Sequence, residues 1–278
     1  MDGPLGRVIL PSFVLTIWVL FGVWLAKGDW TGLNWLLLAV TAAITAIVFW
    51  EFASVFSFGY ALCLVVSPAL VLAVRGITTA SVVVCGLLIV FGLRLLLFSL
   101  RRRHAASAAT MQEHMKRANS AVPTPLKVVV FVFVTTLQTF EVMPAYVVGT
   151  DGRTTPWLWV GGALMLVGLV VETVADEQKH RAKEAAPATF VRTGLWARTR
   201  HPNYTGEIVF QVGLAAVALG SVTGWWQLLA VVVSPAYIVV LMFFSANGGD
   251  AKMAARYGED PEWTAYRAGS GSLLPVGR

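Results

Sequence analysis

Residues 33–74 read LNWLLLAVTAAITAIVFWEFASVFSFGYALCLVVSPALVLAV, and the only charged side chain in this apolar stretch is Glu51. A helix rises about 1.5 Å per residue, so about 20 residues cross the roughly 30 Å hydrocarbon core of a bilayer. The stretch is therefore long enough for two membrane-spanning helices in succession. No Gly or Pro marks a turn near Glu51, which makes this the weakest helix boundary in the chain.

The same apolar character continues along the chain. Of 278 residues, 57% are hydrophobic and only 13% are charged, which is far more apolar than a typical soluble domain. Runs long enough to span a membrane lie near residues 8–26, 33–50, 53–74, 79–100, 128–148, 157–175, 207–223 and 226–244. We therefore predict an all-α, polytopic transmembrane helix bundle with seven or eight spans, and we interpret the first run as a retained helix.

The distribution of basic residues predicts the orientation of this bundle. Of the 21 Lys and Arg residues, 17 flank the runs on one side, whereas Lys27, Arg75 and Arg153 lie on the other and Arg94 lies within a run. Because basic residues are enriched in cytoplasmic loops, both termini are expected in the cytoplasm. The expected location is a bacterial-type inner (plasma) membrane. The net charge of +6 then predicts contact with anionic lipid headgroups, and no nucleic-acid partner is expected.

No internal repeat or low-complexity linker divides the chain, so residues 1–278 are predicted to form a single membrane domain. Its polar residues gather in segments on the cytoplasmic side, chiefly 176–206 and 245–278. The densest group reads RTGLWARTRHPNYTGE, from Arg192 to Glu207, and lies directly before an apolar run. Charge is costly at such a place unless it is used, so this segment is the main candidate for function.

The side chains of this segment suit an anionic, hydroxyl-rich ligand. The amide of Asn203 donates and accepts, Tyr204 offers a ring and a hydroxyl, and the Glu207 carboxylate can hold ribose hydroxyls or a carboxamide. Arg198 and Arg200 have guanidinium groups whose planar shape suits phosphates. The alternative reading, membrane anchors followed by a helix cap, explains the two arginines but does not explain Asn203 together with Glu207.

Two further polar groups have both a functional and a structural reading. Asp176 and Lys183 belong to a cluster of charged residues directly after the sixth run. The structural reading of this cluster is a solvated helix extension with internal ion pairs. Asp250, Arg256 and Tyr257 belong to the tail, where the alternative is an ordinary amphipathic cytoplasmic helix. No histidines have the spacing of metal ligands, so no metal site is predicted.

Glu51 is the candidate catalytic residue within the apolar part of the chain. A carboxyl group in a desolvated pocket can act as a proton donor. The alternative, to which we give equal weight, is that Glu51 has no catalytic role and lies at a tight cytoplasmic turn between two helices.

Five motifs belong to a pattern that extends beyond this chain. They are Gly194-Leu195-Trp196, Arg200-His201-Pro202-Asn203-Tyr204 with Gly206-Glu207, Ala175-Asp176-Glu177-Gln178-Lys179, Phe91-Gly92-Leu93-Arg94-Leu95, and a tail containing Arg256-Tyr257-Gly258. By these motifs the chain resembles the steroid 5-alpha-reductase-like membrane proteins, which include bacterial members of unassigned substrate; the sterol C14 reductases share the pattern. The resemblance runs from about residue 79 to the C-terminus.

The resemblance implies a membrane reductase whose cytoplasmic half binds NADPH and whose lipophilic enone, steroid or sterol-like substrate enters from the bilayer. The positions that match the family's cofactor contacts are Asp176, Asn203, Tyr204 and Glu207, and by looser alignment Lys183, Asp250 and Tyr257. Glu51 matches an early-helix glutamate of the steroid-reducing members. Neither the particular substrate nor the oligomeric state is implied.

Two other classes remain open. Membrane methyltransferases that act on isoprenylcysteine or phospholipid and use S-adenosylmethionine share the Arg-His-Pro-x-Tyr-x-Gly signature. They usually lack a glutamate after that glycine and carry a Glu-Glu pair in the tail that is absent here, so Glu207 favours the reductase. The tyrosine that the steroid reductases use as a second acid falls on Phe91, which leaves a noncatalytic lipid-binding scaffold as the third reading.

Overall fold

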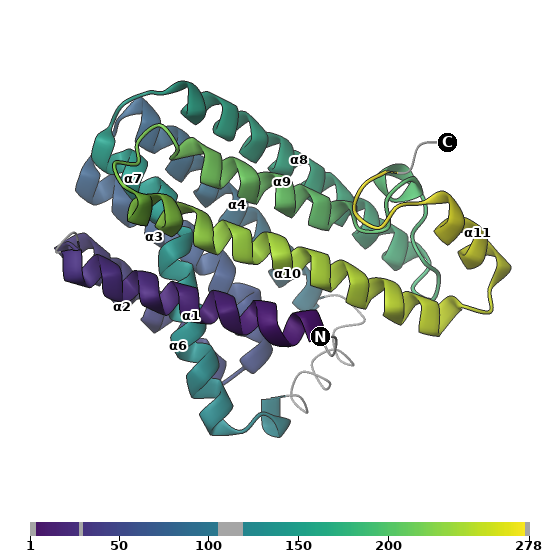
Figure 1. Cartoon of the computed structure of the whole chain (residues 1–278). Helices are drawn as coiled ribbons and strands as arrows, with labels where there is room; N and C mark the ends of the chain where they lie inside the picture. Colours follow the sequence, from purple (N-terminus) through teal and green to yellow (C-terminus); the bar gives the residue numbers. More distant parts are fainter. Residues whose placement is uncertain (1–3, 28–29, 105–118, 276–278) are drawn as a thin grey trace. The chain divides into compact units, whose positions relative to one another are not determined.

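The computed structural model describes residues 4–27, 30–104 and 119–275. Within these ranges the chain is helical and forms no strand; one isolated parallel bridge joins Thr199 to Gly271. The helices are α1 (Pro4–Lys27), α2 (Gly32–Thr45), α3 (Phe58–Arg75), α4 (Thr79–His104), α6 (Thr124–Glu141), α7 (Met143–Asp151), α8 (Pro156–Ala185), α9 (Pro202–Val217), α10 (Trp225–Tyr257) and α11 (Pro261–Gly269) (Figure 1). Three short 3-10 turns are η1 (Ala46–Phe49), η2 (Phe52–Phe56) and η3 (Gly194–Ala197).

Each of the eight predicted apolar runs falls mainly on a helix, although α9 ends at Val217, before the end of the run 207–223. Six helical segments in the described chain are long and apolar enough to cross a membrane: Gly32–Phe49, Phe58–Arg75, Thr79–Arg103, Thr124–Asp151, Pro156–Ala185 and Trp225–Tyr257. The apolar part of α1, Val14–Lys27, is shorter, and α9 has 16 residues. The chain is therefore an integral membrane protein of the all-α, polytopic class, as the sequence predicts.

Two helix boundaries differ in detail from the apolar runs. Around Glu51 the chain leaves the α-helical path at Thr45 and resumes it at Phe58, passing through η1 and η2, so 3-10 turns replace the missing Gly or Pro. The run over residues 128–148 is divided at Val142 into α6 and α7. Pro144 explains this division, because a proline lacks the N–H that would bond to the carbonyl four residues earlier.

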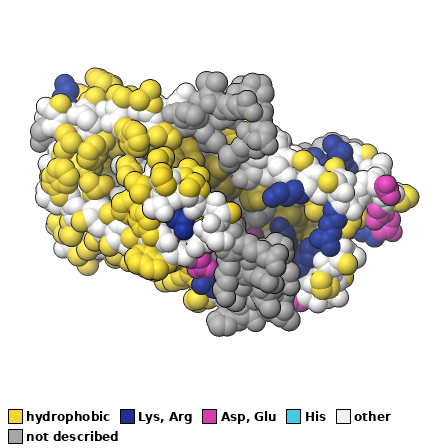
Figure 2. All heavy atoms as spheres, turned by 90° about the horizontal axis from the view of Figure 1, so that it is seen from below, with side chains coloured by type: hydrophobic (Ala, Val, Ile, Leu, Met, Phe, Trp, Pro, Cys, Tyr) yellow, Lys and Arg dark blue, Asp and Glu magenta, His cyan; other side chains and the backbone are white. Residues whose placement is uncertain are grey.

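The chain divides into two compact units. Unit 1 consists of Met1–Pro11, Ala163–Leu214 and Pro235–Arg278, and unit 2 consists of Ser12–Gly162 and Ala215–Ser234. In the view of Figure 2, hydrophobic side chains cover most of the surface over the apolar helices of unit 2, as expected of helices that face lipid. In unit 1, Lys and Arg side chains gather beside the end that carries α11, and Asp and Glu side chains are seen at that end.

Unit 2 is held together by close helix contacts and hydroxyl pairs. A Cβ at Gly92 of α4 would lie 2.8 Å from the carbonyl oxygen of Ala61, so glycine allows α3 and α4 to pack backbone to backbone. Between α2 and α6, the hydroxyl of Thr45 lies 2.6 Å from that of Thr135. Such small and hydroxyl side chains are the usual means of joining helices in lipid.

Candidate functional site

Two glycines bring helices α8 and α9 of unit 1 together. A Cβ at Gly168 would lie 2.4 Å from the backbone nitrogen of Phe210, and a Cβ at Gly206 would lie 2.6 Å from the backbone nitrogen of Glu172. Residue numbers rise along α8 as they fall along the facing part of α9, so the helices run antiparallel. Continuing this register by one turn places Asp176 opposite the start of α9, at Pro202 and Asn203.

This contact collects buried carboxyl groups at the start of α9. Glu172, Asp176 and Glu207 are only 6%, 7% and 6% exposed. The Glu207 carboxylate accepts a hydrogen bond of 2.8 Å from the amide of Gln211, which is fully buried one turn later. Buried carboxyl groups are rare unless they are hydrogen-bonded or used by a ligand, so the α8–α9 contact is the core of the candidate site.

Asn203 contributes a buried acceptor to the same helix turn. Its side-chain oxygen, Oδ1, is shielded from solvent and has no hydrogen-bond partner among the described residues. Leaving a buried acceptor unsatisfied costs about 1–3 kcal/mol, so such an atom in a polar cluster marks a place where a ligand can donate. Next to it, the Tyr204 ring stacks on His201, with centroids 5.2 Å apart and an interplanar angle of 5°.

Arg200, His201 and Asp250 form a charged node beside this turn. Arg200 binds the Asp250 carboxylate with two nitrogens, Nε at 2.9 Å and Nη2 at 3.0 Å, and Nε2 of His201 lies 2.9 Å from Oδ1 of Asp250. All three side chains are less than one-fifth exposed. Gly249 allows this approach, because a Cβ there would lie 2.6 Å from Cε1 of His201.

The node fixes the charge state of His201. Burial is the largest influence and lowers the pKa of His201, while the hydrogen bond and negative charge of Asp250 raise it and the charges of Lys179 and Arg200 lower it again. The balance places the pKa of His201 below its usual value. The imidazole is therefore neutral near pH 7, and the Arg200–Asp250 pair carries the local charge.

The C-terminal segment is tied to the node through its backbone. Arg200 N donates to Gly271 O at 2.8 Å, Gly271 N donates to Arg198 O at 3.0 Å, and His201 N donates to Ser272 O at 3.0 Å. The Arg200 side chain also donates to the carbonyl of Ser270. These bonds hold the segment that precedes α9 in one conformation, so the tail is part of the site's framework.

Trp196 and Tyr266 connect η3 and α11 to the C-terminal part of α8. The indole nitrogen of Trp196 donates to the carbonyl of Ala175 at 2.9 Å, and the hydroxyl of Tyr266 donates to the carbonyl of Trp196 at 2.6 Å. Burial raises the pKa of Tyr266 to about 12, so its hydroxyl stays protonated and remains a donor. Gly194, with φ of +62°, adopts a left-handed turn that brings η3 against Gln178.

Four of the remaining predicted cofactor residues are occupied by contacts within the protein. Arg200 and Asp250 neutralise each other. Lys183 donates to the carbonyls of Pro187 and Thr189, and the Tyr257 hydroxyl donates to the carbonyl of Ala188 at 2.6 Å, so both brace the chain after α8.

Arg198 and Arg256 belong to an exposed basic patch of unit 1. Its members are Lys179, Arg181, Arg192, Arg198, Lys252, Arg256 and Arg267. Of these, Arg192 is paired with Glu262 at 2.9 Å, and the guanidinium of Arg256 lies 5.2 Å from the Tyr257 ring. These residues make this part of the surface of unit 1 basic.

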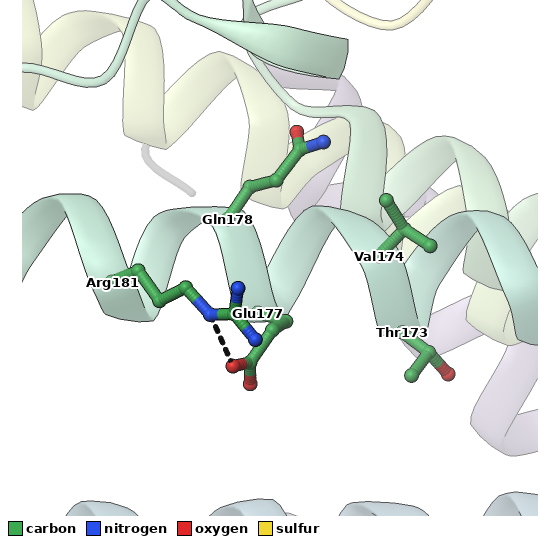
Figure 3. Close-up of a pocket in the computed structure, with 5 residues that line it drawn as sticks. All are labelled: Thr173, Val174, Glu177, Gln178 and Arg181. Atoms are coloured by element: carbon green, nitrogen blue, oxygen red, sulfur yellow. Dashed lines mark hydrogen bonds and ion pairs between the residues drawn. The ribbon is translucent and has the colours of Figure 1, made fainter.

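A hollow follows the outer side of α8 and is lined by Thr173, Val174, Glu177, Gln178 and Arg181 (Figure 3). The Arg181 and Glu177 side chains lie across it as an ion pair of 2.7 Å. Gln178 points away from this pair, and its Oε1 accepts from the backbone nitrogen of Leu195 at 2.9 Å. The hollow therefore has a polar rim but lacks the buried acceptors of the α8–α9 contact.

Glu51, the predicted catalytic acid, belongs to unit 2 and lies at the turn between η1 and η2. Its carboxylate binds the guanidinium of Arg103 at 2.6 Å and is about one-third exposed. Burial alone would raise the pKa of Glu51, but hydrogen bonds from Ser54 and Arg103 and the charge of Arg103 lower it overall. This setting favours an ionised carboxylate at a helix turn over a proton donor, although the catalytic role itself stays a prediction.

Several site residues were not among the predicted ligands. Glu172 lies one helical turn before Asp176, and Gln211 lies one turn after Glu207. Each pair shares a helix face, so the i, i+4 spacing is a sequence signal for Glu172 and Gln211. His201 was part of the quoted motif, but its bond to Asp250 joins residues 49 positions apart. Nothing in a single sequence indicates such a pairing.

The fold and site define a polytopic helical membrane protein with a buried polar cluster between two of its helices. The chain belongs to the family DUF1295, described as a protein of unknown function, whose family model matches residues 51–270. The matched region contains Glu51, the whole α8–α9 contact and the node around Asp250. No curated protein and no solved structure gives a significant match.

Proposed function

We propose that this protein is an NADPH-dependent reductase that acts on a carbon–carbon double bond of a lipophilic enone, steroid or sterol-like substrate taken from the bilayer. The observation that carries the proposal is the buried, unsatisfied oxygen of Asn203, which lies on the same helix turn as the buried carboxylate of Glu207. The resemblance of residues 176–207 to the steroid 5-alpha-reductase-like proteins supports it.

The residues at the α8–α9 contact fit a dihydronicotinamide nucleotide. An amide oxygen that lacks a donor is suited to a carboxamide NH₂, and carboxylates are suited to ribose hydroxyls. Asn203 would hold the carboxamide, and Glu207 and Asp176 the hydroxyls. The stacked rings of His201 and Tyr204 offer an aromatic face beside them.

The charge distribution of unit 1 supplies the phosphate contacts. Because Arg200 is already paired with Asp250, its charge is compensated within the protein. Arg198 and Arg256, which are exposed, are better placed to meet phosphates from solvent. In this proposal Arg200 positions the turn before α9, whereas Arg198 and Arg256 bind the phosphates of the cofactor.

When bound, such a cofactor supplies a hydride to one carbon of the activated double bond, and a proton completes the reduction at the other carbon. The part played by this chain is to bind and orient the cofactor, exclude water through the buried α8–α9 contact, and provide an acid. Glu51 remains the proposed acid. Its ion pair with Arg103 requires that the carboxylate gain a proton before each turnover.

S-adenosylmethionine is the second candidate ligand, because its ammonium and adenine amino groups are also donors that could satisfy Asn203. It would make the protein a membrane methyltransferase of the isoprenylcysteine or phospholipid type. Two features favour NADPH over this ligand. The methyltransferases usually lack a glutamate at the position of Glu207, and S-adenosylmethionine has no phosphate that the basic patch could bind.

A thermal-shift series on the purified, detergent-solubilised protein tests the proposal, because a ligand that binds the folded state raises its stability. NADPH should raise Tm, NADH should do so less, and S-adenosylmethionine should have no effect. Arg198→Ala should weaken the NADPH shift, whereas Arg153→Ala, an exposed arginine of unit 2, should leave it unchanged. Stabilisation by S-adenosylmethionine alone would overturn the reductase, and stabilisation by none of the three would favour a noncatalytic scaffold.

A further inference from the structure

Unit 2 contains a group of buried hydrogen-bond donors around Tyr146 that lack acceptors. The indole nitrogen of Trp24, whose side chain is 1% exposed, has no partner in the described chain. The same holds for the indole nitrogen of Trp30 and for Nε of Arg75. Each unsatisfied buried donor is costly, so three of them in one place call for a common explanation.

A series of ring contacts connects these donors. The rings of Trp24 and Tyr146 are 6.5 Å apart, those of Trp24 and Trp30 are 6.2 Å apart, and the Arg75 guanidinium lies 4.9 Å from the Tyr146 ring. Trp24 lies near the end of α1, Trp30 just before α2, and Arg75 at the end of α3.

Two side-chain oxygens near these donors, those of Tyr146 and Asn34, are already engaged. The Tyr146 hydroxyl accepts from Nη2 of Arg75 at 2.9 Å and lies 3.2 Å from the hydroxyl of Thr31. Asn34 Oδ1 accepts from both the hydroxyl and the backbone nitrogen of Thr31, at 2.7 and 3.0 Å. Among these side chains the donors therefore exceed the acceptors, so the partner that the three orphan donors lack is an acceptor.

The local charge indicates that this acceptor is an anion. Arg75 forms no ion pair with a carboxylate of the described residues, so its positive charge is uncompensated there. Helix α2 begins at Gly32, directly after Trp30 and Thr31, and a helix N-terminus carries partial positive charge. A cation, a helix N-terminus and two indole N–H groups together suit a phosphate-type oxyanion.

The surrounding surface indicates that the anion is attached to a lipid. The Trp35 ring lies 5.7 Å from that of Trp30, and Val74 and Ile77 flank Arg75 in the chain. Their side chains are 50%, 55% and 84% exposed, so apolar surface lies beside the donors. Tryptophan and arginine at the ends of apolar helices lie at headgroup depth in a membrane. A free phosphate ion would gain nothing from these apolar side chains.

We propose that Trp24, Trp30 and Arg75 form a binding site for the phosphate of an anionic phospholipid headgroup, whose acyl chains lie along the exposed apolar side chains nearby. The three donors replace the water that a free headgroup would bind. This site is independent of the proposed reductase activity and of the α8–α9 contact, because every residue in it belongs to unit 2.

Lipid binding to delipidated protein tests the proposal. Dioleoyl phosphatidylglycerol should raise Tm and survive as a bound adduct in native mass spectrometry, whereas dioleoylglycerol, which lacks the phosphate, should do neither. Trp24→Phe keeps an aromatic side chain but removes the indole N–H together with part of the ring, so it should weaken phosphatidylglycerol binding roughly tenfold. Trp18→Phe, at an exposed tryptophan of the same helix, is the matched control and should have no effect.

Three outcomes would overturn the proposal. In the first, phosphatidylglycerol and dioleoylglycerol bind equally well. In the second, Trp24→Phe and Trp18→Phe change phosphatidylglycerol binding by the same amount. In the third, inorganic phosphate raises Tm at the concentrations at which phosphatidylglycerol does. If Trp24→Phe does not fold, Trp30→Phe removes the neighbouring donor from a partly exposed side chain and should give the same loss.

Discussion

His201 connects the charged node to the aromatic stack of the candidate site. Its Nε2 faces the Asp250 carboxylate, its ring stacks on Tyr204, and the positive charges of Lys179 and Arg200 lower its pKa. Burial and these cations disfavour the imidazolium, although Asp250 partly offsets them. The residue is therefore held neutral at the position where the chain enters α9.

This setting predicts a pH dependence of stability. Because the pKa of His201 is lowered on folding, the unfolded chain binds more protons below about pH 6.5, its usual value, so stability is lost as pH falls through that range. Tm measured by differential scanning fluorimetry should fall between about pH 7.5 and 5.5. His201→Gln, which cannot protonate, should flatten this part of the curve. An unchanged slope in His201→Gln would show that another group is responsible.

At the same scale, sequence reasoning identified most of the residues but not their partners. Asn203, Tyr204 and Glu207 share one helix turn, which the spacing alone predicts. Arg200 and Asp250 were both expected to contact the cofactor, yet they bind each other across 50 positions of sequence. A long-range ion pair depends on how α10 packs against the turn before α9, and no local pattern encodes it.

Among the elements, the contact between α8 and α9 decides whether the site exists. Gly168 and Gly206 let the two backbones approach, and the buried carboxyl groups follow from that approach. The pairing was not visible in the sequence, because single glycines in apolar helices have many uses. The division between α6 and α7 could have been predicted from Pro144, which disfavours a continuous helix.

Gly206→Ala tests this contact. The added methyl would lie 2.6 Å from the backbone nitrogen of Glu172, so the helices must separate, and a loss of about 2 kcal/mol or more is expected from such overpacking. Gly248→Ala is the control, because a Cβ at Gly248 meets nothing within 4 Å and alanine favours a helix interior by up to about 1 kcal/mol.

Unfolding of both variants in denaturant provides the measurement. Gly206→Ala should shift the midpoint down, and Gly248→Ala should leave it unchanged or shift it up. Equal effects of the two substitutions would contradict the close α8–α9 packing.

For the whole molecule, composition and the length of the apolar runs are sufficient to predict an all-α membrane protein, because each apolar run must form a helix in lipid. The orientation rests on the distribution of Lys and Arg and is testable with introduced cysteines. Cys63 and Cys85 are buried, so they contribute little background. Thr154 and Ala268 are exposed and lie on opposite predicted sides.

A membrane-impermeant maleimide applied to intact cells should label Thr154→Cys at once. It should label Ala268→Cys only after the membrane is permeabilised, because the tail is predicted to be cytoplasmic. The reverse pattern would place the α8–α9 site on the outer side and would separate it from the cytoplasmic NADPH pool.

Asn203→Leu tests the central claim, the binding of a nicotinamide cofactor at Asn203, most directly. Leucine has a similar size and removes an acceptor that has no partner in the described chain, so the free energy of unfolding without ligand should stay the same or rise by about 1 kcal/mol. The dissociation constant for NADPH, measured by isothermal titration on the same preparations, should increase roughly tenfold or more. Weaker folding with unchanged NADPH affinity would show that Asn203 is a structural residue and would contradict the account.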